Sequence, residues 1–196
     1  MEFQPLHPRR TAFLSMDLQA AIVSMYAKDQ AAFLERTASV LREARSAGAC
    51  VIHVKVGFRP GLPEINPRNA LFQSVKTSER YRQIFEGPQG EIHPAVAPEG
   101  DDIVIVKHRV SAFCGTDLEM ILRAKEIESL ALFGIATSGV VLSTLIDAFD
   151  RDYNIAVIKD CCEDSDAEIH ACLVDKFFPL RAAVVSSTEV KFASPQ

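Results

Sequence analysis

Short apolar runs alternate along this chain with longer segments in which apolar residues recur at helical spacing. The runs are rich in β-branched residues and carry few polar interruptions, which is typical of strands covered on both faces. The predicted strands are Thr11–Met16, Cys50–Val56, Ile103–Val106, Leu130–Phe133, Ile155–Ile158 and Ala182–Val185. Because helical segments separate them, we predict a three-layer α/β/α fold around a six-stranded parallel sheet.

Helix boundaries are marked by capping and stop residues. The predicted helices are Ala31–Ala47, Asp117–Glu126, Ser138–Asp152, one that begins after Ser165 or Asp166, and a brief one near Thr188–Phe192. Gly48 directly follows the first helix and is a typical helix stop. Thr116 and Glu119 have the spacing of a capping box at the start of the second helix.

One segment, at about residues 57–100, interrupts this alternation and is rich in proline and glycine. A connection of this length in a compact fold is usually functional or contains structure of its own. We expect it to cover a site, with a short helix at Ser78–Phe85. The whole chain, residues 1–196, is predicted to be one domain.

Composition excludes several function classes. The net charge is −5, and lysine and arginine are scattered rather than clustered, so we expect no nucleic-acid partner. No apolar run approaches the roughly 20 residues needed to span a bilayer. The polar start of the chain and its five cysteines, which lack metal-site spacing, predict a cytoplasmic protein with reduced thiols and no membrane partner.

Candidate catalytic or ligand-binding residues follow three of the predicted strands. Asp17 follows the first strand, Lys107 follows the third, and the small-residue turn Ala136–Val140 follows the fourth. The carboxyl ends of parallel strands meet at one edge of a sheet, so these groups are expected to converge. A lysine favours the charged carboxylate while desolvation favours the neutral acid, which tunes a proton donor or acceptor.

These motifs also resemble a known family. Asp17-x-Gln19, Lys107 with the following Ser-Ala-Phe-x-Gly-Thr, and Gly134-Ile-Ala-Thr with the following Leu-x-Thr are similar to the isochorismatase-like hydrolases, which include nicotinamidases and other cysteine amidohydrolases. The resemblance covers roughly residues 10–190. It implies a Rossmann-like sheet of six parallel strands and a catalytic triad of aspartate, lysine and cysteine.

The resemblance assigns roles to this chain's residues. Asp17 matches the aspartate, Lys107 matches the lysine, and Val140 stands where the nucleophilic cysteine is expected. The family also implies a cis peptide bond at Ile135–Ala136, with the Ala136 and Val140 amides as an oxyanion hole. Because valine has no nucleophile, the alignment excludes a covalent thioester mechanism at this position.

The isochorismatases proper also lack the cysteine. In them an aspartic acid protonates an enol ether and water adds directly. They have glycine at the position of Val140 and histidine at that of Ser138, and the larger valine argues against isochorismate itself. Substitute nucleophiles are Cys114, the pair Cys161 and Cys162, and Ser138, each less favoured than direct attack by water.

The remaining predictions concern the pocket lining and its occupants. Phe58 and Phe113 are expected as apolar walls, Arg59 and Arg68 as partners for a substrate carboxylate, and Gln19, Asn66 and Ser138 as further substrate-binding residues. Nicotinamidases have an Asp-x-His…His metal set after the second strand, and Lys55–Pro60 contains no such ligands, so no metal or cofactor is expected. His53, within the second strand, is expected to be a core histidine.

Two functions remain open at this point. The first is a small-molecule hydrolase in which Asp17 acts as general acid or base, Lys107 orients it, and water is the nucleophile. The second is a catalytically silent relative that keeps the pocket for ligand binding or uses its surface for assembly. The resemblance also implies a homo-oligomer, a dimer or a tetramer.

Overall fold

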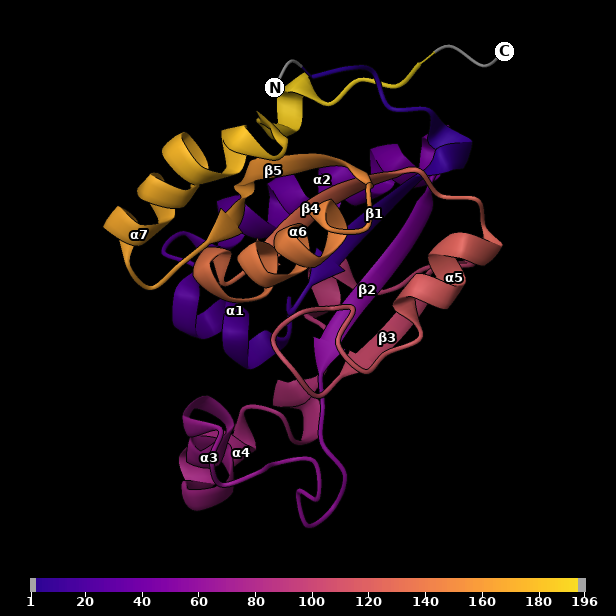
Figure 1. The fold of residues 1–196 in the computed structure, drawn as a ribbon. Helices are drawn as coiled ribbons and strands as arrows, with labels where there is room; N and C mark the ends of the chain where they lie inside the picture. Colours follow the sequence, from indigo (N-terminus) through magenta and orange to yellow (C-terminus); the bar gives the residue numbers. More distant parts are fainter. Residues whose placement is uncertain (1–2, 194–196) are drawn as a thin grey trace.

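A parallel six-stranded sheet forms the centre of the molecule in this computed structural model, which describes residues 3–193 (Figure 1). The strands lie in the order β3-β2-β1-β4-β5-β6, and every neighbouring pair is parallel. They are β1 (Thr11–Met16), β2 (Cys50–Val56), β3 (Ile103–Lys107), β4 (Ser129–Ile135), β5 (Asn154–Glu163) and β6 (Ala183–Val185). The predicted fold class is confirmed.

Helices cover both faces of the sheet, and Figure 1 shows α2 and α6 on opposite faces. The helices are α1 (Ala20–Tyr26), α2 (Gln30–Ala47), α3 (Ala70–Thr77), α4 (Glu79–Gln83), α5 (Leu118–Ala124), α6 (Leu142–Phe149) and α7 (Ala167–Cys172). All six residues of β1 are buried, as expected for a central strand between two helical layers. Within residues 3–193, none of the helices has both the length and the apolarity that crossing a bilayer requires.

The longest helix, α2, begins and ends as its sequence predicts. The carboxylate of Asp29 accepts the N–H of Ala32 at 3.1 Å, which caps the first turn. Gly48 adopts the left-handed conformation, with φ of 76°, and its N–H donates to the last helical carbonyls. The face that contains Phe33 and Leu41 is buried against the sheet. This helix thereby anchors the strands that lead to the site.

The predicted capping box of α5 is wrong. The hydroxyl of Thr116 accepts the N–H of Leu118 at 3.2 Å and donates to the carbonyl of Ala112 at 2.6 Å. Glu119 does not turn back to the helix start, because its carboxylate pairs with Arg151 at 3.0 Å. Arg151, which follows the C-terminus of α6, thus binds the Glu119 carboxylate that would have completed the capping box. The helix begins at Leu118.

Two further boundaries differ from the prediction. The segment predicted as one helix from Ser138 to Asp152 begins with a π-helical turn, Thr137–Val141, and continues as α6. Strand β5 extends five residues beyond its predicted end at Ile158, to Glu163. The sequence pattern did not predict α1, because a seven-residue helix with two fully buried apolar residues carries little periodic signal.

The long segment between β2 and β3 folds over the carboxyl edge of the sheet. It contains α3 and α4, the second of which lies within the predicted helix Ser78–Phe85. In Figure 1 these two helices project beyond the carboxyl ends of the strands. They are held by a small apolar cluster of their own, formed by Leu62, Ile65, Phe72 and Val75. We call residues 57–100 the cover segment.

Candidate active site

Two strand ends approach each other closely because one residue between them has no side chain. Gly134, near the end of β4, has φ of 141°, and a Cβ placed there would lie 2.0 Å from the carbonyl oxygen of Met16. Only glycine therefore allows β4 to lie so close to the end of β1. The next residue after β1 is Asp17, which adopts a left-handed conformation with φ of 55°. This backbone turns Asp17 out of the strand and toward the turn after β4.

Lys107 reaches Asp17 from the far side of β2. Its Nζ lies 2.8 Å from Oδ2 of Asp17, and the two residues are 1% and 5% exposed. Since β2 separates β3 from β1, the two strands are about 10 Å apart at ideal sheet spacing. The four-carbon stem of Lys107 and the side chain of Asp17 together bridge this gap. The structure thus brings together the acid and the lysine that the sequence placed at separate strand ends.

Only one of the two Asp17 carboxyl oxygens has a hydrogen-bond partner among the described residues. Its Oδ1 is buried without a hydrogen-bond partner among the described residues, while Lys107 Nζ also donates to the carbonyl of Arg109 at 3.1 Å. Burial raises the pKa of Asp17, and the nearby ammonium of Lys107 opposes this without cancelling it. A buried carboxyl with a raised pKa and a free oxygen is suited to proton transfer.

The turn after β4 has the shape that the family resemblance implies. The Ile135–Ala136 peptide bond is cis. The carbonyl of Ala136 accepts the N–H of Gly139 at 3.1 Å and the N–H of Val141 at 3.3 Å. These bonds close a tight turn, in which Val140 is buried beside the acid and the lysine.

A second acid, Asp164, supports this turn and was missed by the sequence analysis. Its Oδ2 accepts the N–H of Ser138 at 2.7 Å. Burial raises the pKa of Asp164, but the hydrogen bonds from Ser138, Asp166 and Ser165 outweigh burial and leave that pKa below its ordinary value. Beside it, the Thr137 hydroxyl lies 2.8 Å from Nδ1 of His170. Asp164 directly follows β5, so the strand-end argument would have found it if that strand had been predicted at its full length.

The acid, the lysine and the turn after β4 lie at the base of a cavity of about 410 Å³. The floor contains Asp17, Lys107 and the turn, whereas the walls are apolar and come from α1, β2 and the cover segment. The principal wall residues are Ile22, Val56, Phe72, Val75, Ile84 and Phe85. Exposed Met25, Leu71 and Tyr81 lie at the mouth. The site is a largely apolar pocket with its polar groups at the base, as is usual for small-molecule sites.

Gln19 does not line this cavity. Its amide nitrogen donates to the carbonyls of Val56 at 3.0 Å and Gly90 at 2.7 Å, and its oxygen accepts the N–H of Val56 at 2.8 Å. The buried amide therefore ties the cover segment to the end of β2. Its hydrogen-bonding capacity is used within the protein, and it supports the pocket without facing a ligand.

The predicted aromatic and cationic contacts also lie elsewhere. Phe113 packs 6.2 Å from Tyr153 and under the guanidinium of Arg151, outside the cavity lining. Phe58 packs edge-on against Phe72, behind the wall. Arg59 points into solvent with a 67% exposed side chain. Arg68 and Asn66 belong to the cover segment but not to the cavity lining. Of the predicted substrate-binding residues, Ser138 lines the cavity.

The cysteines considered as substitute nucleophiles also lie outside the cavity lining. Cys114 is exposed, and Cys161 and Cys162 are buried. Burial raises the pKa of Cys161 to about 12 and raises the pKa of Cys162 as well, which keeps both thiols protonated. Among residues 3–193, no cysteine lines the cavity, and no cluster of His, Cys, Asp and Glu is placed to hold a metal ion.

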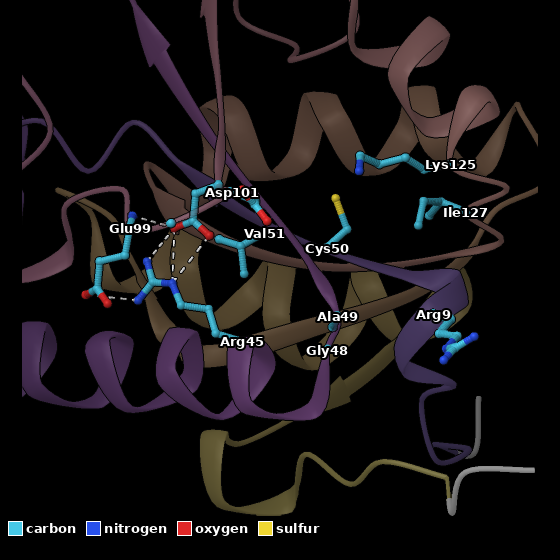
Figure 2. Close-up of a pocket in the computed structure, with 12 residues that line it drawn as sticks. Arg9, Arg45, Gly48, Ala49, Cys50, Val51, Glu99, Asp101, Lys125 and Ile127 are labelled. Atoms are coloured by element: carbon cyan, nitrogen blue, oxygen red, sulfur yellow. Dashed lines mark hydrogen bonds and ion pairs between the residues drawn. The ribbon is translucent and has the colours of Figure 1, made fainter.

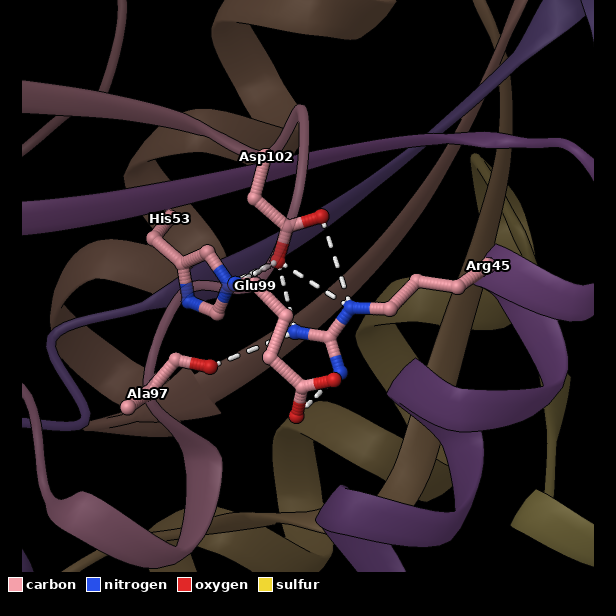
Figure 3. Close-up of polar contacts among 5 residues, drawn as sticks. All are labelled: Arg45, His53, Ala97, Glu99 and Asp102. Carbon is pink, nitrogen blue, oxygen red and sulfur yellow. Dashed lines mark hydrogen bonds and ion pairs between the residues drawn. The ribbon is translucent and has the colours of Figure 1, made fainter.

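A larger hollow, of about 610 Å³, opens at the opposite, amino edge of the sheet (Figure 2). Some of its charged groups are paired: Arg45 contacts Asp102 at 2.6 Å and Glu99 at 3.3 Å. Asp102 also accepts from His53 Nε2 at 3.1 Å and from the N–H of Glu99 at 3.0 Å (Figure 3). His53 is fully buried, which confirms the prediction of a core histidine.

Burial acts on Asp102 as it does on Asp17 but with the opposite outcome. Burial alone raises the pKa of Asp102, but the hydrogen bonds from Arg45, the Glu99 N–H and His53 together outweigh it and leave that pKa below its ordinary value. The amino-edge network therefore stabilises a charged carboxylate.

The fold and site together define a three-layer α/β/α protein with a buried acid–lysine pair at the carboxyl edge of its parallel sheet. Residues 11–190 match the Isochorismatase domain family, and the chain belongs to that family. It is 31% identical over 188 residues to the uncharacterized isochorismatase family protein YecD of Escherichia coli O157:H7, covering 94% of this chain and 96% of that protein.

Other relatives are named as hydrolases. The ureidoacrylate amidohydrolase RutB of Acinetobacter baylyi is 32% identical over 185 residues, covering 84% of this chain and 76% of that one. The structure of a cysteine hydrolase from Pseudomonas syringae pv. phaseolicola superposes with a TM-score of 0.84 at 22% identity, covering 95% and 93% of the two chains. The last similarity establishes the shared fold.

Proposed function

We propose that this protein hydrolyses a small molecule by acid–base chemistry, with water as the direct nucleophile and no covalent intermediate. The observation that carries the proposal is the buried Asp17–Lys107 pair, 2.8 Å apart at the base of a cavity, with one carboxyl oxygen free. Membership of a hydrolase family supports the same conclusion. Such a pair is hard to explain by stability, since buried ion pairs are often no better than apolar replacements.

The two side chains have distinct roles in this proposal. With an enol ether, the Asp17 carboxyl donates its proton to the enol carbon, and the ether oxygen stabilises the resulting cation. Water then adds to that cation and returns a proton to the Asp17 carboxylate, and the resulting hemiacetal collapses to a carbonyl compound and an alcohol. Lys107 holds the carboxyl in place and stabilises the carboxylate that forms. With an acyl substrate, the Asp17 carboxylate instead takes a proton from water as the water attacks the carbonyl carbon, and the Ala136 and Val140 amides bind the developing oxyanion. Asp17 then gives that proton to the leaving amine or alcohol as the acyl bond breaks, which releases the carboxylic acid.

Val140 is proposed to occupy the family's nucleophile position. A valine side chain cannot form an acyl-enzyme, and no cysteine among residues 3–193 lines the cavity. The proposed route therefore needs neither a thiol nor a thioester.

The same valine favours the second candidate, a silent family member that retains the cavity for binding. Its methyl groups are buried in the turn, at the position that the resemblance assigns to the reactive sulfur. This candidate predicts ligand binding without turnover.

A screen of enol ethers, amides and esters separates the two candidates. We expect turnover by the wild-type protein, a loss of at least about 100-fold in Asp17→Ala, and wild-type rates in the matched surface variant Asp150→Ala. If the wild-type protein turns over nothing in the screen, the silent candidate is correct.

The variant Val140→Cys tests the rest of the machinery. If the acid, the lysine and the turn are intact, this variant is expected to gain amidase activity that iodoacetamide abolishes. The control is Val141→Cys, in which the neighbouring position receives the thiol. Equal activity in both variants would show that residue 140 has no special place in the site.

A further inference from the structure

On the basis of the proposed function, we propose that the substrate is an uncharged, largely apolar molecule whose one reactive polar group lies on the cavity floor. The named relative RutB acts on ureidoacrylate, which carries a carboxylate. The electrostatics and lining of this chain's cavity favour a different class of ligand. Three observations carry the inference.

The first observation is the charge of the floor. Among residues 3–193, Lys107 is the one cation that lines the cavity, and its ammonium is already paired with Asp17. The N–H of Ser138, at the start of the turn, is already bound to the carboxylate of Asp164. When the Asp17 carboxyl is ionised, its charge offsets that of Lys107, and the Ser138 N–H is already used by Asp164. An incoming anion would then lose its hydration without gaining a free cation.

The second observation is the position of the cover segment's arginines. Arg59 pairs with Glu64 at 2.5 Å and is largely exposed. Arg82 belongs to a neighbouring hollow that Arg59 also lines, and not to this cavity. Neither arginine lines the cavity, so the sequence-based expectation that Arg59 meets a substrate carboxylate differs from the observed arrangement.

Arg109 is the third arginine near this cavity. It donates to the carbonyls of His108 at 2.6 Å and Glu64 at 3.0 Å, and its guanidinium lies 5.9 Å from the centre of the Phe72 ring. Phe72 lines the cavity, whereas Arg109 does not. The aromatic wall therefore separates this cation from the ligand space.

The third observation is the nature of the walls. Ile22, Val75, Ile84 and Phe85 present hydrocarbon to the cavity. Three hydroxyl-bearing side chains, Tyr26, Ser74 and Tyr81, also line the cavity, and the Ser74 hydroxyl donates to the carbonyl of Leu71 at 2.6 Å. A cavity of about 410 Å³ is in the range that holds a substituted ring or a short branched chain. Its affinity for such ligands comes from burial of apolar surface.

Binding of matched ligand pairs tests the inference independently of turnover. The probes are 4-methylbenzamide against 4-carbamoylbenzoate, and 4-methylphenyl vinyl ether against 4-(vinyloxy)benzoate, so that a methyl group replaces a carboxylate in each pair. Dissociation constants for the wild-type protein are measured at pH 7.5 by ligand-observed NMR. We expect the neutral member of each pair to bind at least tenfold more tightly.

A designed reversal strengthens the test. Ser74→Arg places a free cation in the wall and is expected to tighten binding of the two carboxylated probes at least tenfold relative to the neutral, polar but shorter Ser74→Gln. Wild-type preference for the neutral probes without any turnover would uphold this inference while refuting the proposed function. Equal or tighter wild-type binding of the carboxylated probes, or no binding of either neutral probe, would overturn the inference.

Discussion

Two buried carboxylates lie at opposite edges of the same sheet and show how different surroundings assign different tasks. Asp102, at the amino edge, is bound by Arg45, by His53 and by a backbone N–H. Asp17, at the carboxyl edge, has one lysine partner and one oxygen without a hydrogen bond among the described residues. The Asp17 side chain is 7% exposed and the Asp102 side chain 5%, and each contacts a cationic group, yet their pKa values shift in opposite directions.

The difference lies in hydrogen-bond satisfaction. A carboxylate that receives several donors is stabilised as an anion and held rigidly, which suits a structural role. A carboxyl with an unmet acceptor beside an apolar cavity gains less from being charged and remains able to exchange a proton with a ligand. Both carboxyl groups are buried and both contact a cation, so neither feature explains the opposite pKa shifts.

The largest expected effect is on catalysis at the carboxyl edge. Asp17→Asn removes the proton that the mechanism transfers while keeping the shape of the side chain, and it is expected to lower kcat/KM by about 10³-fold. The matched variant Asp102→Asn should change kcat/KM by less than about threefold at a temperature where it is folded, because no step passes through it. Steady-state kinetics on any substrate found in the screen provide the measurement. Comparable losses in both variants would remove the functional distinction between the edges.

The next effect is on stability at the amino edge. Asp102→Ala leaves His53 and the partly buried Arg45 without their shared acceptor, and we expect the free energy of unfolding to fall by about 3 kcal/mol. Urea denaturation of this variant is compared with that of Asp101→Ala, an exposed neighbour expected to change stability by less than about 0.5 kcal/mol. A loss below about 1 kcal/mol in Asp102→Ala would contradict the structural role.

A smaller effect is expected when the carboxyl-edge pair is removed as a unit. The double variant Asp17→Asn/Lys107→Met replaces both charges and retains a residue that tolerates the left-handed conformation at position 17. We expect its free energy of unfolding to stay within about 1 kcal/mol of the wild-type value or to exceed it. Thermal and urea unfolding provide the measurement. A loss of about 3 kcal/mol would mean that this pair, too, serves stability.

The smallest effect is a difference in pH dependence. The pKa of Asp102 is lowered in the folded state, so its stabilisation is present above the ordinary value of 3.8 and is lost as the pH falls through the folded pKa. The pKa of Asp17 is raised, so its contribution is greatest at low pH and is lost as the pH rises through the folded pKa.

Unfolding free energies measured from pH 3 to pH 8 resolve these two opposite signs. The stability difference between wild type and Asp102→Ala should grow with rising pH. The difference between wild type and the Asp17→Asn/Lys107→Met variant should shrink over the same interval. Curves of the same sign would show that the two carboxylates have similar environments.

Some of this protein was predictable from the sequence because the controlling forces are local or periodic. Uninterrupted apolar runs predicted all six strands, and their common direction placed Asp17, Lys107 and the Ala136–Val140 turn at one edge. The cap at Asp166 and the stop at Gly48 follow from hydrogen bonds made within a few residues. The resemblance to a family supplied the cis peptide bond.

The tertiary structure alone decided where each side chain of the connecting segments points. Gln19, Phe58 and Phe113 have the chemistry of substrate-binding residues, but their partners come from other parts of the chain, and those partners direct them away from the cavity. Arg59 is held away from the cavity by Glu64, five residues further along the chain. The predicted capping box is likewise absent because the Glu119 carboxylate pairs with Arg151, which lies just after α6. Backbone direction follows from local pattern, whereas side-chain direction follows from competition among contacts that exist only after the chain has folded.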